Sequence, residues 1–86
     1  MKKKFKLKGT DLWISSEDIV RTARRLPGGV NDRVRFYAVV EENKYPIRML
    51  AEEAIKLLGK TIPDITTHQA INVIRSLGFE IFEARN

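Results

Sequence analysis

The sequence predicts an α+β domain in which a small, mostly antiparallel sheet packs against three helices. Two observations lead to this class. Residues 34–40 form a β-branched and aromatic run with alternating faces, and three other segments carry apolar residues at helical spacing. All 86 residues are expected to form a single domain, 1–86, because domains usually contain at least about 50 residues. A winged helix is the alternative, in which the third helix enters a nucleic-acid groove and a hairpin forms the wing.

The first eight residues, 1–8, alternate between lysine and apolar side chains, which predicts an edge strand with one basic face. A turn is expected at residues 9–11. The apolar run 12–14 follows, and we expect it to pack beneath the first helix. Trp13 lies in this run and is expected in the core, where most of a tryptophan side chain is usually buried, in preference to the alternative of a base-stacking platform.

The first helix is expected to begin at Ser15 or Ser16, because serine is a good N-cap. Two acidic residues in the first turn suit the positive end of the helix dipole. Pro27 and the two glycines after it are expected to end the helix. The apolar stripe comprises Ile19, Val20, Ala23 and Leu26.

A central strand is predicted over residues 33–41. Residues 41–44 are expected to form a tight reversal in which Asn43 is left-handed, followed by a short return strand at residues 44–45. The face of the central strand that must meet the core comprises Val34, Phe36, Ala38 and Val40. The opposite face comprises Arg33, Arg35, Tyr37 and Val39.

The second helix is expected to have Pro46 at its first position, where the missing N–H is not needed. Glu52 and Lys56 are expected to form an ion pair on its exposed side, one turn apart. Gly59 is expected to end the helix as a left-handed cap. The apolar stripe comprises Ile47, Leu50, Ala54, Leu57 and Leu58.

The third helix begins with a capping-box pattern, Thr66 followed three residues later by Gln69. Gly78 is expected to end this helix as a left-handed cap. Residues 79–82 should then form the last strand, with residues 83–86 frayed. The apolar stripe comprises Ala70, Val73, Ile74 and Leu77.

Composition argues against several kinds of site. The chain has no cysteine and one histidine, His68, so neither disulfides nor a metal site are expected, and a reducing cytoplasmic location fits. No serine lies in a catalytic motif, and the Gly28–Gly29 pair lacks the lysine of a phosphate-binding loop. No apolar run approaches the roughly 18 residues that span a bilayer. We therefore expect no enzyme activity, no cofactor and no membrane partner.

The net charge of +5 favours a polyanionic partner such as nucleic acid. The phosphate contacts expected first come from Lys4, Lys6, Lys8, Arg21, Arg24 and Arg25. Further candidate contacts are Arg33, Arg35, Tyr37, Lys44, Tyr45, Arg48, Thr67, His68 and Arg75. The alternation of Arg33, Arg35 and Tyr37 fits a face with charges for phosphate and a ring for a base, and it fits a solvated strand face equally well.

The start of the third helix, residues 66–69, offers free backbone N–H groups that favour an anion. Thr67 and His68 could add hydrogen bonds to phosphates or base edges. The other interpretation is that this segment only caps the helix.

The central stretch and the last helix resemble a small domain found at the N-terminus of some modification-dependent restriction endonucleases of the McrA-like HNH type. The similarity covers residues 36–81 and rests on KYPIR at 44–48, ITTHQA at 65–70 and IRSLGFEI at 74–81. Arg48 and Ile65 stand where that family often has lysine and phenylalanine, and the nuclease motif is absent. The resemblance implies a stand-alone DNA-binding or accessory module. It also implies that Tyr45, Arg48, Thr66 and Thr67 lie near one another.

We therefore predict a non-enzymatic nucleic-acid-binding module, with double-stranded DNA preferred over RNA, that uses a basic face and helix N-termini. A binding face should gather Arg21, Arg25, Arg33 and Arg35 on one surface. The alternative is a protein-interaction or homodimerisation module that pairs through its first or last strand. Such a module should expose an apolar patch around Phe82 or Val39. The abundance of Lys, Arg, Glu and Ile also resembles thermophile proteins.

Overall fold

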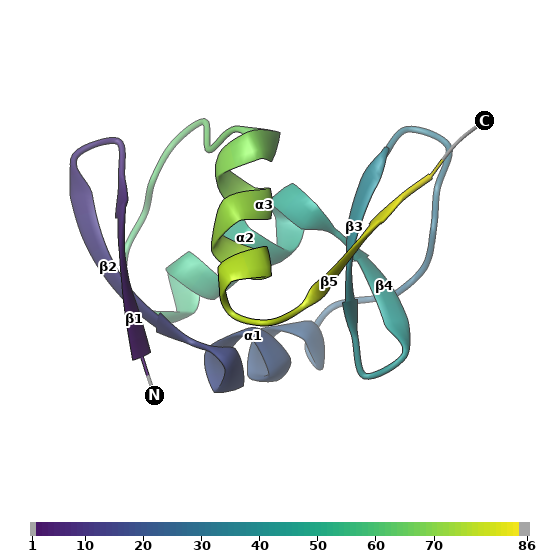
Figure 1. Ribbon diagram of the computed structural model, residues 1–86, viewed down its shortest axis with the longest axis horizontal. Coiled ribbons are helices and arrows are strands. Elements are labelled where there is room, and N and C mark those ends of the chain that lie inside the picture. Colours follow the sequence, from purple (N-terminus) through teal and green to yellow (C-terminus); the bar gives the residue numbers. More distant parts are fainter. Residues whose placement is uncertain (1, 85–86) are drawn as a thin grey trace.

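The computed structural model describes residues 2–84, which form five strands and three helices. In chain order these are β1 (Lys2–Leu7), β2 (Thr10–Ser15), α1 (Ser16–Ala23), β3 (Phe36–Val40), β4 (Asn43–Pro46), α2 (Ile47–Leu57), α3 (Thr67–Ser76) and β5 (Glu80–Glu83). Figure 1 shows the β1–β2 hairpin at one end of the long axis, the other strands at the opposite end, and the helices between them. The predicted α+β class with antiparallel strands is confirmed, but the strands form two sheets instead of one.

The first sheet contains a strand, β2, that the sequence did not indicate. Leu7 pairs with Thr10, so the turn between β1 and β2 consists of Lys8 and Gly9 alone. Their φ angles of 48° and 82° are left-handed, as a two-residue hairpin turn requires. The expected turn at residues 9–11 is therefore one residue out of place.

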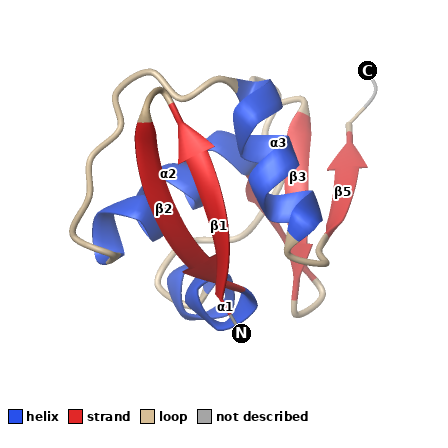
Figure 2. Cartoon of the chain, turned by 60° about the vertical axis from the view of Figure 1, so that its left-hand side comes forward, coloured by secondary structure: helices blue, strands red, loops and turns tan. Residues whose placement is uncertain are grey.

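The prediction that Trp13 lies in the core is wrong. Successive side chains of a strand point to opposite faces, and Leu12 and Ile14 take the buried face of β2. Trp13 points outward and keeps 56% of its surface exposed. In Figure 2 the hairpin lies in front of α2, with its inner face contributing to the core.

The second sheet has the strand order β4-β3-β5 and is antiparallel throughout. Its central strand β3 begins at Phe36, so Arg33 and Arg35 belong to the loop before it. Ala38 and Val40 are buried, which confirms the predicted inner face at these two positions. Both arginines therefore lack the strand geometry that their alternation predicted.

The turn between β3 and β4 is made of two glutamates. Glu41 and Glu42 have φ angles of 50° and 70°, and Val40 pairs with Asn43 across the hairpin. The prediction that Asn43 is left-handed is wrong, because Asn43 is already the first residue of β4. The return strand itself is confirmed.

The helix boundaries follow the predicted caps closely. Ser15 caps α1 and Thr66 caps α3, each through a complete capping box. Gly59 and Gly78 have φ angles of 80° and 96° just after α2 and α3, as predicted. Pro46 differs by one position, because it is the N-cap of α2 and not the first helical residue.

The last strand extends further than expected. β5 includes Glu83, and the Ala84 N–H donates to the Arg35 carbonyl oxygen at 2.7 Å. The fraying predicted for residues 83–86 is therefore wrong at positions 83 and 84. Residues 85–86 lie outside the described part of the chain.

One hydrophobic core joins both sheets to the helices, and α2 packs against both α1 and α3. The predicted stripe residues that are buried are Ile19, Ala23, Ile47, Leu50, Ala54, Ala70, Val73 and Ile74. Leu57, the last residue of α2, is instead 47% exposed. Within residues 2–84, no helix is long and apolar enough to cross a membrane.

Candidate nucleic-acid interface

The outward side of the β1–β2 hairpin presents an alternating set of polar side chains around one aromatic ring. We call this surface the hairpin face, and it comprises Lys2, Lys4, Lys6, Asp11 and Trp13. The strand register places Lys4 directly opposite Trp13 and Lys6 opposite Asp11. All five side chains are on the face opposite the buried Leu12 and Ile14. The hairpin face is therefore exposed while its reverse side is anchored in the core.

Most of the net charge of the protein lies in this hairpin. Residues 2–15 contain five lysines and one aspartate, a net charge of +4, compared with +5 for the whole chain. The other residues thus carry acidic and basic groups in nearly equal number. A dense charge of one sign on a small surface attracts ligands of the opposite sign.

Three of the hairpin lysines, Lys4, Lys6 and Lys8, are only loosely engaged within the protein. The Lys4 ammonium lies 3.7 Å from an Asp11 carboxylate oxygen, with both side chains about half exposed. Exposed pairs of this kind contribute about 0–1 kcal/mol. Lys6 and Lys8 form no ion pair within residues 2–84. These ammonium groups can contact phosphate without losing a strong partner.

Several of the predicted arginines, in contrast, are paired with carboxylates. Arg24 binds Glu41 through two hydrogen bonds of 3.0 and 2.8 Å, and this contact lowers the pKa of the Glu41 carboxyl. The other pairs are Arg21–Asp18 at 3.6 Å, Arg35–Glu83 at 2.6 Å and Arg48–Glu52 at 3.8 Å. The positive charge of these four arginines is therefore largely balanced by neighbouring carboxylates.

The pair predicted between Glu52 and Lys56 is wrong. Lys56 lies 3.6 Å from Glu53 instead, while Glu52 is taken by Arg48. Both contacts are spaced three or four residues apart on α2, so each is compatible with helix geometry. Arg48, one turn before Glu52, occupies the carboxylate that was predicted to pair with Lys56.

The remaining predicted cations are spread over different elements. Arg25, Arg33 and Arg75 form no ion pair within the described residues. They lie after α1, in the loop before β3 and on α3, respectively. Lys44 lies on β4 with its ammonium 4.5 Å from the centre of the Phe82 ring, a cation–π contact.

The four arginines expected to gather on one surface line two different hollows. Arg21 and Arg25 border a shallow hollow of about 610 Å³ along α1. Arg33 and Arg35 border another of about 690 Å³, where the loop before β3 meets α2. Glu52 and Glu53 also line the second hollow, so its charge is mixed.

Neither predicted tyrosine is available to a ligand. Tyr37 is fully buried, and its hydroxyl lies 2.8 Å from the Asn31 carbonyl oxygen and 2.9 Å from that of Val34. It also accepts a hydrogen bond from the Asn31 N–H at 3.0 Å. Tyr45 is 6% exposed, with its ring against Gly28. Both tyrosines hold the loop between α1 and β3 against the second sheet.

The start of α3 confirms the capping interpretation for Thr66. Its hydroxyl oxygen accepts from the Gln69 N–H at 3.1 Å, and the Gln69 side chain accepts from the Thr66 N–H at 3.0 Å. Thr67 and Arg48 line the same hollow, so that part of the expected proximity is present. Tyr45 borders a different hollow, and His68 is exposed.

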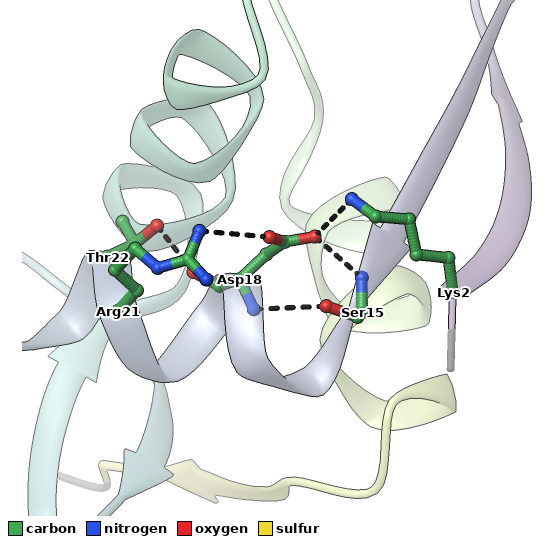
Figure 3. A network of polar contacts seen from close by, with 5 residues as sticks. All are labelled: Lys2, Ser15, Asp18, Arg21 and Thr22. Carbon is green, nitrogen blue, oxygen red and sulfur yellow. Dashed lines mark hydrogen bonds and ion pairs between the residues drawn. The ribbon is translucent and has the colours of Figure 1, made fainter.

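A polar network ties the edge of the hairpin face to α1 (Figure 3). The Asp18 carboxylate accepts from the Ser15 N–H at 2.9 Å and from the Lys2 ammonium at 3.1 Å. Arg21 approaches the same carboxylate, and the Thr22 hydroxyl donates to the Asp18 carbonyl oxygen at 2.7 Å. The network fixes the orientation of the hairpin relative to α1.

Trp13 is a functional candidate that the sequence pattern assigned to the core in preference to a base-stacking role. Its exposure could have been predicted from its position between Leu12 and Ile14, with polar residues at positions 11 and 15. This alternation also fits a strand with one solvent-exposed face. Among residues 2–84 no cluster of three metal-binding side chains occurs. No protein-family model, curated protein or solved structure gives a significant match to this chain. The similarity to McrA-like endonucleases stays a prediction.

Proposed function

We propose that this protein is a non-enzymatic nucleic-acid-binding module, with DNA as its ligand, and that the hairpin face is its contact surface. One observation carries the proposal: residues 2–15 hold a net charge of +4 out of +5 for the chain. Three of the lysines concerned, Lys2, Lys4 and Lys6, alternate along one exposed face of β1. This arrangement suits phosphate groups, which need cations but little precise geometry.

The arginines have a secondary part in this proposal. Exposed ion pairs are weak, so Arg48 could exchange the Glu52 carboxylate for a phosphate at little cost, whereas Arg21 would have to leave the buried Asp18 carboxylate. Arg25 has no such pair within the described residues and could extend the contact without that cost, although it lies outside the hairpin face.

The proposal is tested by measuring the affinity for fluorescently labelled DNA, duplex and single-stranded, across a salt series. The variant Lys4→Glu/Lys6→Glu is expected to weaken binding strongly. It should also reduce the slope of log affinity against log salt by roughly 1.4–1.8, the value for two phosphate contacts.

The matched control is Arg33→Glu/Lys44→Glu, which makes the same change in charge near the second sheet, at the opposite end of the molecule. Binding that survives this control assigns the contact to the hairpin. An equal loss of affinity in both variants would show that the hairpin face is not the contact surface. If the folded wild-type protein binds neither form of DNA at low salt, the proposal fails.

A second candidate function is homodimerisation through β5. Within residues 2–84, β5 pairs only with β3, which leaves its other edge open, and Phe82 is 36% exposed. Antiparallel pairing of two copies would, however, bring Glu80 near Glu83 of the other copy, which opposes association. Sedimentation equilibrium at several protein concentrations separates this candidate from the first.

A further inference from the structure

We propose that the hairpin face binds single-stranded nucleic acid in preference to duplex, with the Trp13 ring stacked on an unpaired base. This inference rests on the proposed function and names the form of its ligand. The sequence predicted Trp13 in the core and offered the Tyr37 ring for a base, but Tyr37 is fully buried. The structure instead exposes 56% of Trp13.

Within residues 2–84, Trp13 makes no hydrogen bond and no ring–ring contact that would require an indole. The nearest cation, the Lys4 ammonium, lies 6.0 Å from the ring centroid, at the outer limit of a cation–π contact. The outward residue two positions earlier, Asp11, is polar. Aromatic side chains, tryptophan among them, are enriched at binding interfaces relative to the rest of a protein surface.

The surroundings of Trp13 match the two requirements of single-strand binding. Such proteins combine aromatic rings that stack on bases with cations that follow the backbone. Lys4 lies directly across the hairpin from Trp13, and Lys6 lies two residues further along the same face. A base stacked on the indole would place its flanking phosphates over these two lysines.

A duplex meets these requirements less well. Its bases are already stacked on one another, so only their edges face a groove, where a protein reads hydrogen-bond groups. The hairpin face offers ammonium groups and an indole, but within it only Asp11 accepts hydrogen bonds strongly. Since every base has an aromatic face, we expect little dependence on sequence.

Trp13 is the only tryptophan of the chain, so its fluorescence reports the contact directly. Titration with a short oligothymidylate should quench this fluorescence, and titration with a short duplex at the same salt should leave it nearly unchanged. Quenching by the duplex at equal or lower concentration would overturn the inference.

The variant Trp13→Thr removes the ring from an exposed strand position and is expected to weaken binding of labelled oligothymidylate by about 5- to 150-fold. Trp13→Phe, which keeps a ring, should restore most of the affinity. Phe82→Thr, the removal of a partly exposed ring from the second sheet, is the matched control and should have little effect. Circular dichroism confirms that each variant is folded.

The two proposals fail in different ways. If Trp13→Thr leaves single-strand affinity unchanged while the salt-dependent loss in Lys4→Glu/Lys6→Glu persists, the stacking inference is wrong and the proposed function stands. If neither oligothymidylate nor duplex binds at low salt, both are wrong.

Discussion

Asp18 shows how one buried carboxylate can link an N-terminal strand to a helix. Burial by itself raises the pKa of this carboxyl, but the hydrogen bonds from the Ser15 N–H and the Lys2 ammonium outweigh burial, so the pKa is lowered. Because the folded-state pKa lies below the ordinary value, ionised Asp18 stabilises the fold above that value. This contribution is lost as the pH falls through the folded-state pKa.

The variant Asp18→Asn tests this role. It is expected to lower the free energy of unfolding by about 1–2 kcal/mol at neutral pH, since the ion pairs with Lys2 and Arg21 are lost. Urea denaturation across acidic pH should show a smaller stability loss on acidification than in wild type. Asp11→Asn, at an acid that is half exposed, is the control and should change little. A stability difference between Asp18→Asn and wild type that does not shrink in acid would contradict this account.

Trp13 and Tyr37 show, at the same scale, where sequence reasoning about single residues fails. Both side chains point away from the main core, as their positions between inward-facing neighbours require. The loop between α1 and β3 covers Tyr37 and bonds its hydroxyl at Asn31, while nothing covers Trp13 to the same degree. The alternation of side chains was visible in the sequence, but the loop that covers Tyr37 was not.

At the scale of the elements, the β3–β4 turn contains backbone strain that glycine residues would not have. Left-handed backbone costs a residue other than glycine about 1–2 kcal/mol, and both turn residues, Glu41 and Glu42, are left-handed. Arg24 compensates in part by holding Glu41. Glu42 has no hydrogen bond or ion pair within the described residues.

Glu42→Gly is therefore expected to stabilise the protein by about 1 kcal/mol, because glycine adopts this conformation without steric cost. Thermal denaturation followed by circular dichroism measures the change as an increase in Tm. Glu42→Gln removes the charge and keeps the conformational cost, so it should leave Tm nearly unchanged. A decrease in Tm for the glycine variant would show that the turn is not strained.

Local chemistry predicted some elements well. Ser15, Thr66, Gly59 and Gly78 were identified as caps because capping depends on residues within one turn of the helix end. β2 was not predicted because a six-residue strand is stable only when it is paired with another strand. Its pairing with β1 becomes evident only once the two-residue turn at Lys8 and Gly9 is known.

At the scale of the whole molecule, the two sheets are joined through a single core. Leu12 and Ile14 of β2 belong to the same buried cluster as Leu50 of α2 and Ala38 of β3. The hairpin is thus packed on the helices even though, in the part of the chain that the structure describes, no strand pairing connects it to the second sheet. Shared burial of this kind favours all-or-none unfolding.

We therefore expect the hairpin and the helical core to unfold together. In native-state hydrogen exchange, the best-protected amides of β1–β2 should show the same opening free energy as those of α2. A clearly lower value for the hairpin would instead show that it opens by itself. That result would also mean that the hairpin face is not held in a fixed shape.

The sequence by itself determined the fold class, the three helices with most of their caps, and the net positive charge. These features depend on composition, on periodicity or on residues close together along the chain. Only the tertiary structure decided where the charge is effective, because ion pairing of Arg24 and Arg35 joins residues far apart in sequence. It also decided that Trp13 is exposed and Tyr37 is buried, since exposure depends on which segment folds over a strand.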